Sequence, residues 1–246
     1  MQQLSRRTAI VSGVLAVAGV ALGRAPASAA VPGQSNGGVR IMPLGDSITD
    51  GYTPYPGGYR VKLWHLLAVG GYTVDFVGTQ TNGPAELGDR DHEGHPGWRI
   101  DQLYANIDTW LGQSDPRTIM LLIGTNDLNQ NYDIANAPAR LSGLIDRIRA
   151  GEPQSELFVA TVPPQSNATL EGRVKAYNSA IPAVVASKGS RVHLVKMYEA
   201  LTTSDLADGI HPTRAGYEKM AAVWFNALRS VPSSLVPLGA GQAAAR

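Results

Sequence analysis

The sequence predicts a three-layer α/β fold, in which five parallel strands form a central sheet with helices on both faces. Two observations lead to this prediction. Short apolar runs alternate along the chain with longer amphipathic stretches, and this alternation is typical of parallel strands joined by right-handed crossovers. In addition, the run at 118–123 is apolar almost throughout, as expected for a strand that helices cover on both faces.

The first half of the predicted domain alternates strand and helix. The apolar run at 39–44 predicts the first strand, and the amphipathic stretch at 59–69 predicts a helix that ends at a pair of glycines. A second strand at 72–77 is followed by a polar segment at 78–98, which we expect to be a loop. Because this loop is longer than most connections in compact domains, we expect it to have a functional role.

The second half repeats the alternation, after a helical stretch at 100–111. Strands and helices follow one another at 118–123, 134–149, 157–162, 170–187, 192–197 and 213–228. In the stretch at 134–149, Leu141, Leu144 and Ile148 fall on one stripe, which is the pattern of a helix that packs one face against a sheet.

Residues 1–29 have the features of a secretory signal peptide. Arg6 and Arg7 precede the apolar run at 9–22, and the small residues at 27–29 resemble a signal cleavage site. The arginine pair favours export by the twin-arginine route, although a general export signal also begins with positive charge. The apolar run is short for a membrane span. We therefore predict a secreted protein without stable membrane insertion.

The mature domain is predicted at 39–229, between a flexible lead-in at 30–38 and a loose C-terminal tail at 230–246. Removal of the signal takes away three arginines and no acidic residue, so the formal charge changes from +1 to −2. The domain has no clusters of basic residues, so its sequence gives no indication of a nucleic-acid-binding surface. The absence of cysteine excludes disulfides and thiol catalysis. With 43% apolar residues, we expect a self-sufficient globular monomer.

A turn directly after the first predicted strand presents Ser47. The segment Gly45-Asp46-Ser47 follows the apolar run, and the carboxyl end of a parallel strand is where α/β folds place ligands and nucleophiles. We therefore predict that Ser47 attacks an ester. A Gly-x-Ser-x-Gly pattern also surrounds Ser35, but we reject it because it precedes the first strand and leads into no helix.

The predicted partners of this serine, Asp208 and His211, lie between the last strand and the last helix. Three positions separate them, and Pro212 keeps them out of an ordinary helix interior. This spacing lets the carboxylate bind the imidazole Nδ1–H and leaves Nε2 free to take the proton of Ser47 and return it to the leaving alcohol. The alternative for His211 is a structural histidine that caps the last helix.

Two residues near other strand ends are candidates for an oxyanion hole. Asn126 follows the strand at 118–123 and offers an amide N–H, while Gly97 has no side chain and can turn its backbone N–H toward the substrate. The backbone N–H of Ser47 is a third candidate donor. The alternatives are an Asx turn at Asn126 and an ordinary turn at Gly97.

These segments resemble the four motif blocks of the GDSL esterase/lipase family, also called SGNH hydrolases. The letters S, G, N and H of the name SGNH correspond to Ser47, Gly97, Asn126 and His211, in that order along the chain. The resemblance implies a flavodoxin-like sheet, a Ser-His-Asp mechanism completed by Asp208, and an oxyanion hole formed by Ser47, Gly97 and Asn126. Such chemistry passes through an acyl-enzyme and needs no cofactor.

A narrower resemblance indicates the substrate. The segments 75–79 and 91–98 are similar to a carbohydrate esterase branch that contains acetylxylan esterases. This resemblance implies that the substrate is a small acyl ester or an acetylated polysaccharide, with the O-acetyl groups of xylan-like carbohydrate as the first choice. The alternatives are a lipase, phospholipase or thioesterase that acts on longer acyl chains, and a non-catalytic carbohydrate-binding protein with the same fold.

Asp46, Tyr52 and Trp98 are candidates for substrate binding, although hydrogen bonds that stabilise the turn around Ser47 also explain Asp46 adequately. The two aromatic rings are suited to stacking on sugars, although packing within the protein explains them equally well. The acidic and histidine residues at 91–95 lack the His-Glu-x-x-His spacing of a zinc site, and the glycine and proline beside them disfavour a helix. We therefore expect hydrogen bonds that shape the loop, and no metal site.

Overall fold

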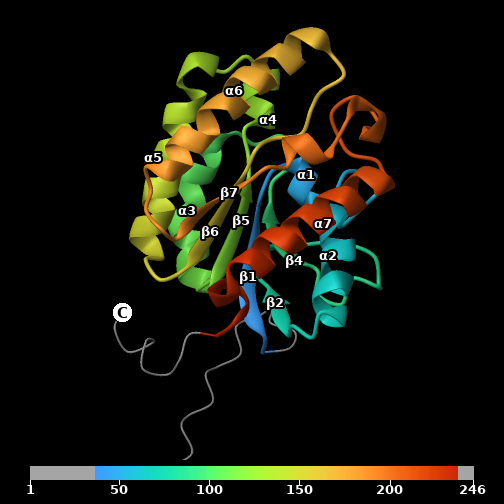
Figure 1. Ribbon diagram of the computed structural model, residues 1–246, viewed down its shortest axis with the longest axis vertical. Coiled ribbons are helices and arrows are strands. Elements are labelled where there is room, and N and C mark those ends of the chain that lie inside the picture. Colours follow the sequence, from blue (N-terminus) through green and yellow to red (C-terminus); the bar gives the residue numbers. More distant parts are fainter. Residues whose placement is uncertain (1–36, 238–246) are drawn as a thin grey trace, which may run out of the picture. The chain divides into compact units, whose positions relative to one another are not determined.

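In the computed structural model, the described residues 37–237 contain a central sheet between two layers of helices (Figure 1). The strands are β1 (Val39–Gly45), β2 (Val74–Phe76), β3 (Gln80–Thr81), β4 (Asp91–Gly94), β5 (Thr118–Leu122), β6 (Glu156–Ala160) and β7 (Val192–Val195). The α-helices are α1 (Ser47–Asp50), α2 (Gly58–Val69), α3 (Ile100–Ser114), α4 (Thr125–Asn129), α5 (Ala137–Gly151), α6 (Ala168–Ala186) and α7 (Arg214–Ser230). Short 3-10 helices are η1 (Ile134–Asn136), η2 (Tyr198–Ala200), η3 (Thr203–Asp205) and η4 (Pro232–Leu235). The predicted signal peptide and most of the predicted lead-in lie outside the described residues.

The sheet confirms the predicted α/β class. Its strand order is β3-β4-β1-β5-β6-β7, with β2 also paired to β1. The pairs are parallel except for β3 and β4, which run antiparallel. The five predicted strands appear as β1, β2, β5, β6 and β7, and the structure adds β3 and β4 to them.

The two additional strands correct the prediction of a loop at 78–98. β2 pairs with residues 39–41 of β1 and β4 pairs with residues 44–45, while β5 occupies the other edge of β1. β2 and β4 therefore fill one position of the sheet in two pieces, and β3 lies in the connection between them. The sheet keeps five parallel positions, as expected, with one of them interrupted.

The polar composition of β4 explains why no sequence pattern marks it as a strand. His92, Glu93 and Gly94 are buried, and the Glu93 carboxylate and His92 Nδ1 have hydrogen-bond partners. Glu93 accepts hydrogen bonds from the backbone N of Thr79 at 2.7 Å and from its Oγ1 at 2.8 Å. His92 Nδ1 accepts a hydrogen bond from the backbone N of Gly94 at 3.0 Å. The two bonds from Thr79 reach 14 residues along the chain, so this strand forms only when the two segments come together in the folded domain.

Both faces of the sheet are buried, as the apolar runs predicted. Successive side chains of a strand point to opposite faces, so in β5 Ile119 and Leu121 pack with α3, α5 and α6, whereas Met120 and Leu122 pack with α2 and α7. Figure 1 shows these two helical layers on either side of the strands. Among residues 37–237, no helix combines the length and apolarity that a membrane span requires.

The packed domain extends past residue 229, where the sequence predicted its end. η4 follows α7, and Leu235 is only 6% exposed. The carbonyl oxygen of Ser234 accepts a hydrogen bond from Thr118 Oγ1 at 2.7 Å. The expected loose tail therefore cannot include residues 232–235, which are held by contacts with the start of β5.

Parallel pairing places the carboxyl ends of the central strands at one edge of the sheet. Ser47 follows β1, Gly97 follows β4 and Asn126 follows β5. His211 lies in the connection between β7 and α7. The topology thus brings the predicted site residues together from four separate segments.

Candidate active site

Ser47 is the first residue of α1, directly after the sharp turn that ends β1. A Cβ at Gly45 would lie 2.3 Å from the carbonyl oxygen of Leu122, so the close approach of the turn to β5 requires glycine. Asp46 is the N-cap of α1, and its Oδ1 accepts a hydrogen bond from the backbone N of Ile48 at 2.9 Å. This cap fixes the start of the helix and the position of Ser47.

Asp46 is fully buried, which corrects its prediction as a substrate-binding residue. Burial and, to a smaller extent, the charge of Asp127 outweigh the hydrogen bond from Ile48 and together raise the pKa of this carboxyl to about 7. A side chain without exposed surface has no route to the substrate in this structure, so the role of Asp46 is to shape the turn.

The three predicted catalytic residues form one hydrogen-bonded series. Ser47 Oγ lies 2.8 Å from His211 Nε2, and His211 Nδ1 lies 2.8 Å from Asp208 Oδ2. The other oxygen of Asp208 accepts hydrogen bonds from the backbone N of His211 at 2.7 Å and of Ile210 at 3.0 Å. Desolvation raises the pKa of Asp208, but these bonds outweigh it and hold the pKa below its usual value. The carboxylate therefore stays ionised beside the imidazole.

Tyr52 contacts the imidazole from one side. Its ring is stacked on that of His211, with 4.2 Å between the ring centres and 8° between the planes. The backbone N of Tyr52 donates to Tyr217 Oη at 3.1 Å, which ties this segment to α7. The sequence predicted Tyr52 as a candidate for sugar stacking, but in the structure one face of its ring covers the histidine.

Gly97 lies in the exposed segment between β4 and α3. Its φ is +80°, a conformation that side chains disfavour, so glycine suits this turn. The backbone N of His95 donates to the carbonyl oxygen of Gly45 at 3.0 Å. The segment is thereby attached to the same strand end that presents Ser47.

Asn126 lies in the first turn of α4 and contacts both neighbouring segments. Its Nδ2 donates to the carbonyl oxygen of Trp98 at 2.9 Å and lies 3.5 Å from Asp46 Oδ2. The second contact is long for a hydrogen bond. One N–H of the Asn126 amide therefore has a good hydrogen bond to Trp98. The other N–H has only the long contact with Asp46.

Trp98 is half-buried and packs within the protein. Its ring is stacked on His95 with 4.3 Å between centres, and His95 is also stacked against Trp110 at 4.6 Å. His95 Nε2 lies 2.6 Å from the buried carboxylate of Glu93. These contacts favour packing as the first role of Trp98, the alternative that the sequence left open.

His92, Glu93 and His95 are engaged in hydrogen bonds that shape this segment. Burial, together with the charges of Arg60 and His95, lowers the pKa of His92 to about 2, so its imidazole is neutral. Within the described part of the chain, no group of three or more histidine or acidic side chains is arranged to hold a metal ion.

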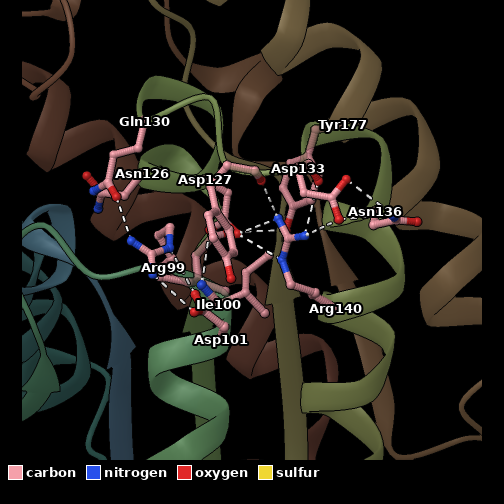
Figure 2. Close-up of polar contacts among 12 residues, drawn as sticks. Arg99, Ile100, Asp101, Asn126, Asp127, Gln130, Asp133, Asn136, Arg140 and Tyr177 are labelled. Carbon is pink, nitrogen blue, oxygen red and sulfur yellow. Dashed lines mark hydrogen bonds and ion pairs between the residues drawn. The ribbon is translucent and has the colours of Figure 1, made fainter.

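A buried carboxylate that the sequence did not single out holds α4 in place. Figure 2 shows Asp127 between Ile100 and Arg140. One carboxylate oxygen accepts a hydrogen bond from the backbone N of Ile100 at 3.0 Å, and the other accepts from Arg140 Nη2 at 2.9 Å and Nε at 3.2 Å. Burial raises the pKa of Asp127, while the bonds from Ile100 and Arg140 counteract this rise.

Three side chains from α4 and its C-cap hold the segment that carries Gly97. Asn126 binds the carbonyl of Trp98, Asp127 binds the backbone N of Ile100, and Gln130 Nε2 donates to the carbonyl of Gly97 at 2.9 Å. We call these three residues the α4 clamp. Arg140, on α5, stabilises the clamp by binding Asp127. It lies 13 residues after Asp127, and no sequence pattern indicates that the two residues form a pair.

A comparison of the sequence with protein families agrees with the arrangement of Ser47, His211 and Asp208. The model of the GDSL-like lipase/acylhydrolase family matches residues 44–219, which is more than half of the chain. The chain belongs to this family. The GDSL-like segment begins just before Ser47 and includes Asp208 and His211, so all the residues of the hydrogen-bonded series lie within it. The family that the sequence predicted, one of carboxylic ester hydrolases, is therefore confirmed.

One relative is similar over most of the chain. A multidomain esterase of Ruminococcus flavefaciens is 34% identical over 220 residues, which make up 76% of this chain and 28% of that protein. The chain thus spans little more than a quarter of that relative's length.

Two solved structures share the fold. A family 3 carbohydrate esterase from Clostridium thermocellum is 37% identical, with a TM-score of 0.72 and coverage of 81% of this chain and 99% of that one. A family 3 carbohydrate esterase from Talaromyces cellulolyticus is 27% identical, with a TM-score of 0.71 and coverage of 78% and 97%. These neighbours confirm the three-layer fold of the GDSL-like domain.

Proposed function

We propose that this GDSL-like protein is a serine esterase that removes short acyl groups, acetyl first, from xylan-like carbohydrate. The observation that carries the proposal is the series Ser47–His211–Asp208, with both side-chain contacts at 2.8 Å. It supplies a nucleophile, a base and a group that orients the base. The carbohydrate part of the proposal is supported by the names of the two solved structures, both family 3 carbohydrate esterases.

In the first half of the proposed reaction, Ser47 Oγ attacks the ester carbonyl while His211 Nε2 takes its proton. Asp208 holds the imidazole in the tautomer with hydrogen on Nδ1 and stabilises the imidazolium that forms. The backbone N–H groups of Ser47 and Gly97 and the amide of Asn126 bind the negative oxygen of the tetrahedral intermediate. This intermediate collapses, the bond from the carbonyl carbon to the sugar oxygen breaks, and the imidazolium donates its proton to that oxygen, which leaves as a hydroxyl.

In the second half, water hydrolyses the acyl-enzyme. His211 Nε2 removes a proton from water, and the resulting hydroxide attacks the acyl carbonyl at the same oxyanion donors. The bond to Ser47 then breaks, its Oγ regains the proton from the imidazolium, and the free carboxylic acid leaves. Each proton that the histidine accepts is returned in the same half-reaction, so the residues finish in their starting state.

Export belongs to the same proposal, because a polymeric substrate lies outside the cell. We propose that the signal at 1–29 directs the twin-arginine route. Replacement of Arg6 and Arg7 by lysine should retain the protein inside the producing cells. Secretion that continues unchanged would favour the general export route instead.

The decisive experiment compares acetate release from acetylated xylan with hydrolysis of p-nitrophenyl esters of increasing chain length. Ser47→Ala should lower kcat by several orders of magnitude. Ser179→Ala is a matched control, because Ser179 is exposed and its hydroxyl donates only to Ala176 within α6. A maximum rate at long chains would support a lipase instead, and absence of turnover on every ester would support a binding protein.

A further inference from the structure

A cavity of about 400 Å³ lies between the α1–α2 connection and the start of α7. This volume is within the roughly 300–1,000 Å³ that small-molecule sites occupy. Tyr55, Val61 and Tyr217 contribute ring and aliphatic surface to its lining. Its rim carries exposed charged side chains of both signs, namely Lys62, Glu86, Arg214 and Glu218.

Two short segments connect this cavity to the catalytic histidine. Tyr52 stacks on His211, and Tyr55, three residues later, lines the cavity. His211 itself is followed three residues later by Arg214, which also lines the cavity. Three residues span at most about 10 Å of chain. The cavity therefore lies close to His211, and the segment that carries Tyr52 and Tyr55 leads from one to the other.

Packing holds the aromatic ring of the cavity in place. Tyr55 meets Tyr217 edge to face, with 6.5 Å between ring centres and 70° between planes. The guanidinium of Arg214 lies 5.8 Å from the centre of the Tyr55 ring. Tyr217 is buried and also accepts the hydrogen bond from the backbone N of Tyr52. One residue thus supports both the ring that covers the histidine and the ring that lines the cavity.

The chemistry of the cavity matches a sugar ring better than an acyl chain. A pyranose presents C–H groups on its faces, which pack on tyrosine, and hydroxyls around its edge, which bind charged side chains of either sign. An acyl chain would form no hydrogen bonds with the four charged side chains and would partly displace the water that hydrates them. A single phosphate or carboxylate would meet Glu86 and Glu218 as well as the two cations.

We propose that this cavity is a carbohydrate subsite, which binds a sugar unit of the polysaccharide next to the one that carries the ester. This inference rests on the proposed function, because it assumes that the ester belongs to a polysaccharide. The subsite would use binding energy remote from the reacting carbonyl to orient the polymer at Ser47. A simple aryl acetate, which has no second ring, would not reach it.

The test compares kcat/KM on acetylated xylan with kcat/KM on p-nitrophenyl acetate. Tyr55→Ala should lower the ratio of the two values about tenfold, mainly through KM on the polymer, since one aromatic stacking contact is removed. Tyr55→Phe keeps the ring and should restore the ratio. Tyr104→Ala is the matched control, because Tyr104 likewise has an arginine over its ring, with Arg147 at 4.5 Å, but it lies on α3.

Each other outcome has a distinct meaning. If wild-type protein hydrolyses the aryl acetate but releases no acetate from the polymer, the carbohydrate substrate is wrong and the subsite falls with it. If the wild type acts on the polymer and Tyr55→Ala leaves the ratio within twofold, the proposed function stands and the subsite is refuted. If Tyr55→Ala selectively slows p-nitrophenyl octanoate, the cavity is an acyl site and the inference is equally refuted.

Discussion

Replacement of Arg140 by methionine tests whether the buried carboxylate of the α4 clamp depends on its charged partner. Asp127 has no exposed surface, and the side chain of Arg140 is 18% exposed. Methionine keeps most of the length and apolar contact of arginine but leaves the carboxylate without a cation. Breaking a buried ion pair in this way costs about 3–5 kcal/mol. Because Arg140 is partly exposed, we expect about 3 kcal/mol at pH 8.

The cost should depend on pH in a defined direction. The pKa of Asp127 is already raised by burial, and Arg140 lowers it, so the variant should have a higher pKa than the wild type. A native carboxyl with a raised pKa binds a proton that the unfolded chain does not bind, so stability is lost as pH rises through this range. The free energy of unfolding of Arg140→Met should therefore lie closer to the wild-type value at pH 5 than at pH 8.

Urea unfolding followed by tryptophan fluorescence at both pH values measures this difference. Arg147→Met is the control, because Arg147 lies on the same helix and binds Asp108 at 2.8 Å, but in an exposed pair. Such pairs contribute little, so the control should show no comparable pH dependence. Asp127→Asn combined with Arg140→Met should recover stability at pH 8, since the buried charge is gone. An equal cost at pH 5 and pH 8 would refute the reasoning.

Three further substitutions test other parts of the site. Asn126→Ala should lower kcat on the order of 10²-fold with KM nearly unchanged, because the lost donor acts on the oxyanion; steady-state kinetics in which only KM changes would contradict this role. Asp208→Asn should lower kcat about 10⁴-fold, because asparagine cannot stabilise the imidazolium of His211, and a loss below tenfold would count against the assigned orienter. His92→Asn should reduce the loss of stability on acidification. The native pKa of His92 is about 2, whereas histidine in the unfolded chain takes up a proton below about pH 6.5. This difference in proton uptake lowers the free energy of unfolding of the wild type by about 2 kcal/mol between pH 7 and pH 5. Urea titrations at pH 7 and pH 5 measure the change in the free energy of unfolding. If this change is the same in the variant and the wild type, His92 is not the group responsible.

The parts of the fold that follow from burial were readable from the sequence. β5 and β6 are apolar because helices cover both of their faces. Apolar character is a property of each residue separately, so the sequence shows it directly. The same applies to the stripe of Leu141, Leu144 and Ile148 on α5. The site residues Ser47 and His211 were found for a related reason, since parallel topology places segments that follow strand ends at a common edge.

Polar pairing over long distances was decided by the tertiary structure alone. β4 looks like a loop in the sequence because its stability depends on partners such as Thr79, 14 residues before Glu93. η4 looks like a tail because its anchor, Thr118, lies 116 residues earlier. No period or composition records such a pairing, because each partner is an ordinary polar residue until the fold brings the two together.

The sequence by itself therefore determined the layers of this protein, the edge of the sheet at which the site lies and the residue types that carry the proposed chemistry. The tertiary structure decided how these residues are held. It stacked Tyr52 on His211, buried Asp46 within the turn and paired Asp127, which binds the backbone N of Ile100, with Arg140. The physical reason is that hydrophobic burial is a property of single residues in a periodic pattern, whereas hydrogen bonds and ion pairs need the geometry of two groups at once.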